Sequence, residues 1–549
     1  MKKKNKTMKK TGFITGAFVS TFGIVVTKIL GILYVIPFYA IIGDSGGALY
    51  GYAYTIYLLF MSLSSAGIPL AISKIISEYQ TLGYYSAKRR AFVIGKKLAL
   101  LLGGICFLVL IIFAPLIAKT VLGDLTGGNS IEDVTFVIRI ISLAILVVPI
   151  LSIYRGYFEG HRFMIPPSFS QIIEQIIRVL VIILGSFLAL KVFNFSLTSA
   201  VGIAVFGATA GAIGAYLYLV NKKLNNKKRF QEKVLDTNEP IITDKEIFKK
   251  IILYAVPFIM IDVFKALYNY IDMVTVVKAL VHEANFTTKD AEVVFSMIST
   301  WCSKFNMIVL AISTGVIVSL IPNLTASYVK KDKKEVQSKI NQAFQILLFF
   351  TVPMSMGISF LSKPIWNVFY GTSNYGANVL SYYIFVALFM SLFTVSISII
   401  QLFKDYKSVF ISLISGVVLK LLLNVNLIRA FYKMGLPAYY GSITASIIGF
   451  LVSFIICLFI LHKKYGINYE STLKSFMDIL CGSMIMIFVL SLVKFVVPVY
   501  FDSRLLNVLI IVFYTLLGGL VYFIFTKCIG TIKNIFGNKL RFKIIKKSE

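Results

Sequence analysis

The feature that most constrains this chain is a long apolar run near its start, from Thr11 to Gly43. The run has no acidic side chain and a single basic one, Lys28, near its middle. A stretch this long and this apolar is typical of a membrane-spanning helix rather than of a helix in the core of a soluble domain. A charge at bilayer depth is costly unless it faces protein or water, so Lys28 is a candidate functional residue.

The same pattern recurs along the whole chain, and it predicts an all-α polytopic membrane protein. Of the 549 residues, 58% are hydrophobic and only 14% are charged, and the mean hydropathy of +0.85 lies outside the range of soluble domains. We count about fourteen segments long enough to span a bilayer. They lie in 12–42, 50–77, 92–118, 134–157, 166–190, 196–220, 248–277, 292–322, 340–362, 379–403, 408–428, 439–462, 473–497 and 505–527.

Basic residues are distributed unevenly between the segments that join these helices. The segments expected on one side hold 39 lysines and arginines, against nine on the other side. Because cytoplasmic loops of membrane proteins are enriched in basic residues, we expect the richer side, with both termini, to be cytoplasmic. The net charge of +31 is explained by anionic lipid headgroups, and no basic domain stands apart to indicate a nucleic-acid partner.

The longest hydrophilic segment, 221–250, follows the sixth predicted helix and divides the first twelve helices into two sets of six. The two sets are weakly similar: SSAGIPLAISKIISEY at 64–79 corresponds to ISTGVIVSLIPNLTASY at 312–328. Parallel repeats of this kind place a substrate site between the halves, near the bilayer midplane. We therefore predict two six-helix lobes and a C-terminal helix pair. The predicted boundaries are 1–220 for the N-terminal lobe, 221–247 for a linker, 248–463 for the C-terminal lobe, and 464–549 for the helix pair and tail.

Charged residues inside the predicted helices are mostly basic. Seven are cations, whereas three carboxylates lie comparably deep. An excess of buried cations indicates a cavity that accepts an anion. The candidate substrate-binding residues are Lys28, Lys304, Lys265, Arg178, Lys74 and Lys420; Arg139 is interpreted as an anchor at the membrane interface. Candidate polar or ion-coupling residues are Asp262, Asn269, Asp272, Glu174 and Asn424.

Several of these residues also have a purely structural interpretation. Glu174 and Arg178 are spaced i, i+4 on one helix face, so an internal ion pair competes with a substrate contact. Lys74 is close enough to a helix end to extend to the interface. The seventh predicted helix carries a polar stripe at helical spacing, formed by Asp262, Lys265, Asn269 and Asp272. This stripe either lines a cavity or packs on another polar helix. Lys28 and Lys304 have no acidic residue nearby in the sequence, which makes them the strongest candidates.

Motifs of the common enzyme classes do not occur in the sequence. The three histidines lie outside any HExxH pattern, the five cysteines form no CxxC pair, and there is no phosphate-binding loop. We therefore expect no catalytic residue, metal or cofactor. Energy for transport would come from a gradient, the membrane potential or consumption of the product.

Three motifs resemble one family of transporters. They are Thr27-Lys28-Ile29-Leu30-Gly31 with the AIIGDSG turn that follows, SAGIPLAISKIISEY at 65–79, and Pro322 after Gly315. They resemble the MurJ-type lipid II flippases, in the branch related to stage V sporulation protein B and the polysaccharide biosynthesis proteins of Gram-positive bacteria. This branch belongs to the multidrug/oligosaccharidyl-lipid/polysaccharide exporter superfamily.

The resemblance implies a fold, a substrate and a place for some of the cations. It implies a V-shaped cavity between two lobes, cations that hold a lipid-linked pyrophosphate, and a groove for the polyprenyl tail at the two extra helices. A first-helix arginine of the family matches Lys28, and an eighth-helix arginine falls within a residue of Lys304. Tyr34 replaces a second first-helix arginine of Gram-negative relatives, and their second-helix arginine falls near Met61 and Ser62. Lys74, Arg178 and Lys265 are candidates to compensate.

The function expected on these grounds is an alternating-access flippase in the bacterial cytoplasmic membrane, acting as a monomer. Its substrate would be an undecaprenyl-pyrophosphate-linked cell-wall precursor such as lipid II, and its other partners membrane lipids. A flippase for another lipid-linked polysaccharide and a cation-coupled multidrug exporter remain as alternatives, although the exporter would call for an acidic cavity. A membrane glycosyltransferase would need more buried carboxylates and larger outer loops.

Overall fold

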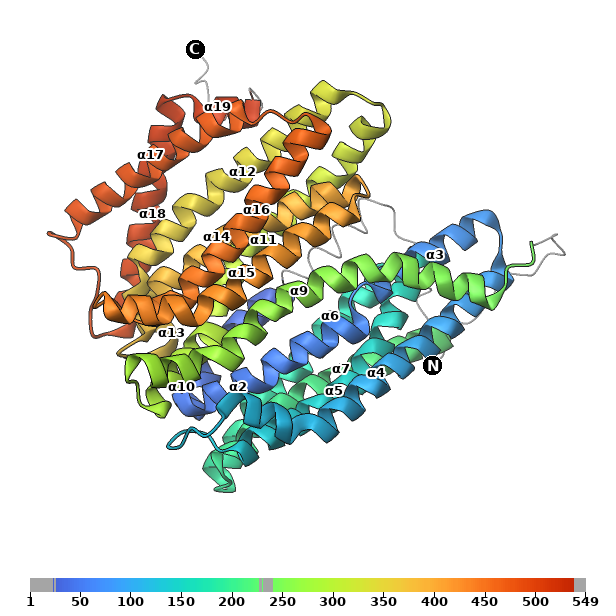
Figure 1. The fold of residues 1–549 in the computed structure, drawn as a ribbon, viewed down its shortest axis with the longest axis horizontal. Helices are drawn as coiled ribbons and strands as arrows, with labels where there is room; N and C mark the ends of the chain where they lie inside the picture. The colour runs from blue at the N-terminus through green and yellow to red at the C-terminus, as the bar shows by residue number, and fades with distance from the viewer. Residues whose placement is uncertain (1–22, 24–25, 227–229, 231–239, 538–549) are drawn as a thin grey trace, which may run out of the picture. The chain divides into compact units, whose positions relative to one another are not determined.

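The computed structural model describes residues 23, 26–226, 230 and 240–537, and in these ranges every regular element is a helix (Figure 1). Within the described residues, thirteen helices, counting directly joined ones as one, are long and apolar enough to cross a bilayer. Of the predicted first helix, 12–42, residues 26–33 and 35–42 are described as helical, and the start lies outside the described residues. The all-α polytopic fold class is confirmed.

Contacts between residues divide the chain into two compact units, Met1–Trp301 and Cys302–Glu549. The predicted boundary between lobes, after the sixth helix, is based on similarity between the two halves of the sequence. The two compact units are instead defined by contacts between residues, so they do not test that boundary. The division into lobes of 1–220 and 248–463 therefore stays a prediction, and the two contact units are described separately below.

The first unit is built around a buried central helix, α5. This helix packs against α2, α3, α4 and α7, and α9 packs against α2, α3 and α4. A capping box at Ser130 and Asp133 fixes the start of α5. The elements of the unit are α2 (Val35–Ser65), α3 (Ile68–Leu82), α4 (Tyr85–Leu122), α5 (Ile131–Gly160), α6 (Ile165–Leu180), the π-helices η1 (Val181–Gly185) and η2 (Leu188–Val192), α7 (Leu197–Asn225), α9 (Asp244–Ala284), α10 (Thr288–Ser296) and the π-helix η3 (Met297–Trp301).

Two glycines break the helices at the start of this unit. Gly43 has φ +64° within α2, where the sequence predicts the turn between the first and second helices. Gly67 has φ +72° and precedes Pro69 in the first turn of α3, so the second predicted helix is broken in its interior. A Cβ at Gly67 would lie 2.5 Å from the carbonyl oxygen of Ala255 in α9, and one at Gly156 in α5 would overlap that of Pro69. Only glycine allows these close approaches.

The second unit has α14 at its centre, in contact with α11, α12, α13, α15 and α16. The most extensive pairing is between α15 and α16. The predicted C-terminal pair is present: α17 packs on α12 and α18, and α18 packs on α13. The elements of this unit are α11 (Cys302–Val329), α12 (Lys333–Phe360), α13 (Ser362–Tyr370), α14 (Gly376–Leu402), α15 (Tyr406–Lys433), α16 (Tyr440–Tyr465), α17 (Glu470–Val493), α18 (Arg504–Cys528) and α19 (Thr531–Phe536).

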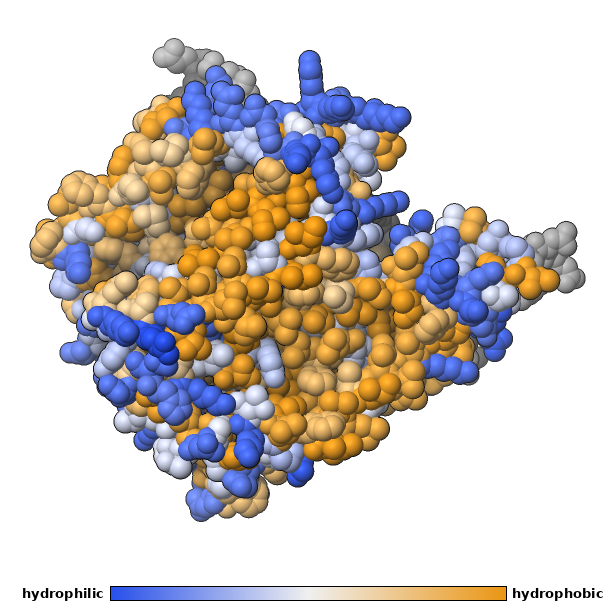
Figure 2. All heavy atoms as spheres, in the orientation of Figure 1, coloured by the Kyte–Doolittle hydropathy of each residue, from blue (hydrophilic) through white to orange (hydrophobic). Residues whose placement is uncertain are grey.

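The surface of the first unit has the distribution of hydropathy that a bilayer requires. Figure 2 shows hydrophobic residues along the middle of its helices and hydrophilic residues at their two ends. In α4, leucine and isoleucine side chains such as Leu101, Leu108 and Ile112 are exposed. Exposed apolar side chains over the length of a helix are stable in lipid rather than in water. The protein is therefore a multi-pass membrane protein.

Candidate functional site

A buried cluster of opposite charges lies in the first unit between α5 and α6. Glu174 accepts hydrogen bonds from Arg155 and from Arg178, each at 2.7 Å. The side chains of all three residues are about 15% exposed. Two guanidinium groups share one carboxylate, so the cluster keeps one net positive charge. The ion pair that the i, i+4 spacing of Glu174 and Arg178 predicts is present.

Tyrosines of α2 surround the same cluster. Arg178 donates from Nη1 to the hydroxyl of Tyr54 at 3.1 Å, and the Tyr54 ring stacks on Tyr50 with centroids 5.1 Å apart. The Nε of Arg178 is buried and has no hydrogen-bond partner among the described residues. One donor of this cluster is therefore not used by the described part of the chain.

Lys28 belongs to a helical segment that lies against α6. A Cβ built on Gly31 would be 3.6 Å from Nε2 of Gln175, the residue that follows Glu174. The Lys28 side chain is half-buried. Within the first unit, the helix that carries Lys28 thus packs on the helix that carries Glu174 and Arg178.

The predicted polar stripe of the seventh helix lies on α9 in the first unit. Asp262 and Asn269 are exposed, Lys265 is half-buried and Asp272 is buried. The stripe is therefore not enclosed as a whole. Its spacing puts the four residues on one side of the helix, and of the four only Asp272 is buried.

Lys74 and Glu78, four residues apart on α3, contact two different residues of α9. The Lys74 ammonium lies 3.9 Å from the centre of the Tyr254 ring, and Glu78 accepts from Lys250 at 2.6 Å. The Lys74 side chain is exposed. A cation over an aromatic ring stabilises the contact between helices without a carboxylate.

In the second unit, Lys420 is completely enclosed between α15 and α16. Its ammonium donates to Oδ1 of Asn424 at 2.9 Å, to the carbonyl oxygen of Ser442 at 2.8 Å and to Oγ of Ser446 at 2.7 Å. Lys420 and Asn424 are both 0% exposed. Because an ammonium has three donors, these bonds account for all of them. Lys304, in the first turn of α11 just after η3, is half-buried.

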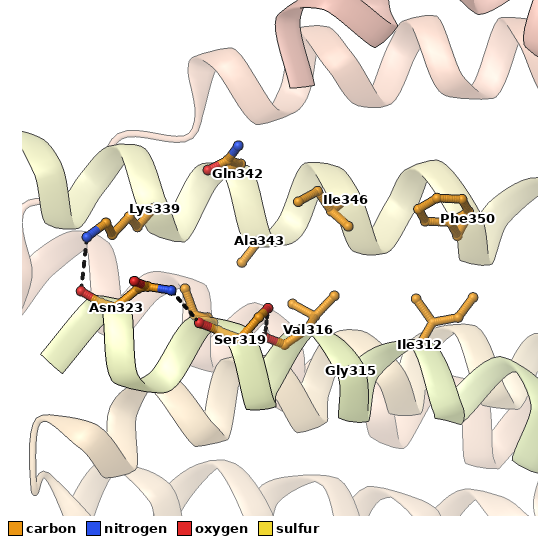
Figure 3. A pocket seen from close by; sticks show the side chains of 11 residues that line it. Ile312, Gly315, Val316, Ser319, Asn323, Lys339, Gln342, Ala343, Ile346 and Phe350 are labelled. Atoms are coloured by element: carbon orange, nitrogen blue, oxygen red, sulfur yellow. Dashed lines mark hydrogen bonds between the residues drawn. The ribbon is translucent and has the colours of Figure 1, made fainter. Parts of the chain in front are cut away.

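Two grooves of the second unit run along α12. One, of about 380 Å³, is apolar and is lined by α12, α17 and α18 with residues such as Pro353, Met486, Leu490 and Gly518. The other, of about 470 Å³, lies between α11 and α12, with Lys339 near one end and Phe350 near the other (Figure 3). Phe350 lines both grooves. The first groove is at the helix pair where the resemblance implies a polyprenyl-binding groove.

Sequence reasoning missed two charged residues of the first unit. Arg155, near the end of the predicted helix 134–157, was counted with the basic residues of the connection that follows, but α5 continues to Gly160 and Arg155 reaches Glu174. Glu292 is 2% exposed and accepts from the backbone and side-chain amides of Asn129, at 3.0 and 2.9 Å. The long apolar run before Arg155 could have indicated that the helix extends further. No signal in the sequence marks Glu292, because its burial depends on the distant segment that contains Asn129.

No group of three or more His, Cys, Asp or Glu residues suited to a metal occurs among the described residues. The first unit thus contains cations, one shared carboxylate and tyrosines, and the second unit contains apolar grooves. Such a set can bind and compensate an anion that carries an apolar chain.

Solved structures with this fold define the class of protein. A lipid II flippase MurJ in an inward closed conformation matches 93% of this chain and 99% of its own, with a TM-score of 0.63 and 19% identity. An inward-facing multidrug resistance MATE family transporter of the MOP superfamily matches 81% of this chain and 98% of its own, with a TM-score of 0.62 and 12% identity. The chain has the fold of the MOP superfamily transporters.

Sequence comparisons define the family more narrowly. The family model for polysaccharide biosynthesis proteins matches residues 13–320, and the MatE model matches residues 299–425. The lipid II flippase MurJ of Bacillus subtilis (strain 168) is 34% identical over 537 residues, which are 96% of this chain and 97% of the relative. Stage V sporulation protein B of the same organism is 23% identical over 67% of this chain and 68% of its own. The chain belongs to the polysaccharide biosynthesis protein family, in its MurJ-type branch, and the resemblance seen in the sequence is confirmed.

Proposed function

We propose that this chain is a flippase that moves an undecaprenyl-pyrophosphate-linked cell-wall precursor, lipid II, from the cytoplasmic to the outer leaflet. The observation that carries the proposal is the 34% identity to a lipid II flippase over almost the whole length of both chains. The relatives with lower identity include a sporulation protein, so lipid II is favoured over other lipid-linked saccharides by similarity in sequence.

The chemistry of the described residues supports an anionic lipid as substrate. A pyrophosphate that crosses a bilayer needs its charges compensated, and a long isoprenoid chain needs an apolar path. Lys28, Lys265 and Lys304 are half-buried, and Arg178 has a donor not used by the described chain. We propose these four residues for contact with the pyrophosphate. Lys74 and Lys420, held by Tyr254 and by three neutral oxygens, we propose to stabilise the fold.

The proposal includes an orientation. The concentration of basic residues in alternate connections favours cytoplasmic termini and a cytoplasmic location for 221–250, in the bacterial plasma membrane. We propose that the chain acts as a monomer. Labelling of single cysteines introduced at Asn226 and Asn285 checks the orientation, because reagents that do not cross the membrane should reach only Asn285 from outside.

Conditional replacement in a bacterium tests the function. Depletion of the resident lipid II flippase should be tolerated when this chain is expressed, and lipid II should reach the outer leaflet at close to the normal rate. Growth without transport of lipid II, or transport of a different lipid-linked saccharide alone, would contradict the proposal.

A substitution in the groove at α17 and α18 tests the place of the isoprenoid tail. Gly357 lines this groove, and a Cβ there meets nothing within 4 Å, so Gly357→Leu fills the groove without a clash. Transport of a long-chain substrate should fall about tenfold, since roughly one well-formed apolar contact region is lost, about 1.4 kcal/mol. Gly104→Leu in α4 has equally open surroundings and is the matched control. An equal effect of both variants would show that transport does not depend on this groove.

A further inference from the structure

A cavity of about 830 Å³ in the second unit lies where four helices meet and is not part of the site above. It lies between the C-terminal ends of α11, α14 and α16 and the N-terminal end of α12. Its lining combines lysines with aromatic rings. Those used below are Tyr328, Lys331, Lys333, Lys334, Phe403 and Tyr465.

The electrostatic balance of this end is strongly positive. Segments 330–339, 403–407 and 463–466 contain nine lysines and three carboxylates. Each carboxylate has a partner in its own neighbourhood. Glu335 pairs with Lys339 at 2.7 Å, Asp405 pairs with Lys464 at 2.6 Å, and Asp332 caps α12 by accepting from the amide of Glu335 at 3.0 Å. Lys331, Lys333 and Lys334 remain as exposed cations on the cavity wall.

The apolar part of the same cavity is formed by stacked rings. Phe403 stacks on Tyr465 with ring centroids 4.3 Å apart, and Tyr328 lies 4.7 Å from Phe403. Val329, at the last position of α11, is 73% exposed. Tyrosine rings at the end of a membrane-spanning helix are typical of the level of the lipid headgroups. Cations and apolar surface thus meet where a phosphate and the first carbons of its acyl chains meet in a bilayer.

We propose that this cavity binds the headgroup of an anionic membrane phospholipid, with the phosphate at Lys331, Lys333 and Lys334 and the glycerol end of the acyl chains against Tyr328 and Phe403. A phosphate group on a lipid satisfies both halves of the lining, whereas a free soluble anion would leave the rings unused. Basic pockets between helices at the membrane surface bind anionic headgroups by this combination. The site is separate from the cations proposed for the transported substrate.

Retention of phosphatidylglycerol by the full-length protein tests the proposal. The protein is reconstituted in nanodiscs of phosphatidylcholine with one-tenth phosphatidylglycerol, and bound lipid is quantified by native mass spectrometry. The variant is Lys331→Gln with Lys333→Gln and Lys334→Gln. Because each lysine near an anionic surface contributes roughly fivefold in affinity, retention of phosphatidylglycerol should fall at least tenfold, and retention of phosphatidylcholine should not change.

The control removes the same charge elsewhere. Lys222→Gln with Lys245→Gln and Lys249→Gln alters three exposed lysines of the first unit and should change retention less than twofold. The variant with arginine at 331, 333 and 334 should retain phosphatidylglycerol as the wild type does. If the glutamine triple is not recovered from membranes, the comparison of retention between this arginine variant and the wild type is the test. A loss with arginine equal to that with glutamine, or equal losses in the glutamine triple and the control, would overturn the proposal.

One further arm separates the phospholipid from the transported substrate. Saturating undecaprenyl pyrophosphate should leave the bound phosphatidylglycerol in place. Displacement would assign the cavity to the substrate and overturn the phospholipid proposal, while the proposed flippase function would stand.

Discussion

Each of the two units stabilises a buried cation, and they do so in different ways. In the first unit, Arg155 and Arg178 share the carboxylate of Glu174. In the second unit, Lys420 is enclosed by an amide, a carbonyl and a hydroxyl oxygen. The first arrangement balances charge with charge and leaves the Nε of Arg178 unused by the described chain. The second satisfies every donor of the ammonium with dipoles.

The difference indicates that buried charge alone does not identify a binding residue in this protein. A cation whose donors are all used by its own helices is a structural element, while a cluster with a surplus charge and an unused donor can accept a ligand. Lys420 and Arg178 are both basic residues in apolar helices, each with a polar residue four positions away, Asn424 and Glu174. Which of the two keeps an unused donor follows only from the folded surroundings.

Loss of the shared carboxylate should have the largest effect. Glu174→Gln leaves two buried guanidinium groups without a counter-charge, which costs about 3–5 kcal/mol. We expect a large decrease in thermal stability in detergent and less protein in the membrane. Glu78→Gln, which breaks the more exposed pair with Lys250, is the control and should cost roughly 1 kcal/mol or less. Similar losses for the two variants would show that burial does not distinguish these carboxylates.

Removal of the enclosed ammonium should have the next largest effect. Lys420→Met leaves buried acceptors on Asn424, Ser442 and Ser446 without their donor, at a cost of roughly 2–3 kcal/mol. Thermal unfolding should shift downward, and transport per folded molecule should stay near normal. Lys433→Met changes an exposed lysine of the same helix and should have little effect. Normal stability with lost transport would contradict a structural role for Lys420 and indicate that it contacts the substrate.

Substitution of the half-buried Lys28 and Lys304 should lower transport rather than stability, the opposite of Lys420. Lys28→Met and Lys304→Met each remove one charge-assisted contact, worth about 1.5–3 kcal/mol, and should lower transport roughly ten- to hundredfold without loss of protein. Lys→Arg at either position should keep much of the activity, because it preserves charge. Complementation of a flippase-depleted strain by both methionine variants at normal expression would exclude a cationic contact at these positions.

The smallest effect is expected at an ion pair outside the membrane-spanning segments. Partial burial alone would raise the pKa of Asp405, but hydrogen bonds from Lys464 and Ser408 lower it overall. Its contribution to stability is therefore present above the unfolded-state pKa, near 4, and is lost as the pH falls through the lower folded-state pKa. Asp405→Asn should cost about 1 kcal/mol or less near neutral pH, because Lys464 is exposed. A stability curve from pH 3 to pH 7 for both proteins measures this difference.

Much of the fold could be predicted from the sequence, because hydropathy and helix length are local properties. Most of each predicted segment is helical where the structure describes it, although 50–77 is divided between α2 and α3 at Gly67, and 473–497 extends past the end of α17 at Val493. The short helices α13 and α19 were not predicted. The partners of the charged residues depend on tertiary contacts. The pairing of Arg178 with Glu174 followed from helical spacing, whereas the partners of Arg155 and Glu292 belong to other segments. Of the oxygens around Lys420, that of Asn424 is on the same helix, and those of Ser442 and Ser446 are on the next.

The glycines at the broken second helix have a consequence for movement. At Gly67 and Gly156 the backbones of α3, α9 and α5 touch without side chains between them. A side chain can change rotamer to adapt to a small displacement, but two backbones in direct contact cannot adapt in this way. The broken helix should therefore move together with α5 and α9 as one rigid body. Bending during a transport cycle would then have to occur at other points of the first unit.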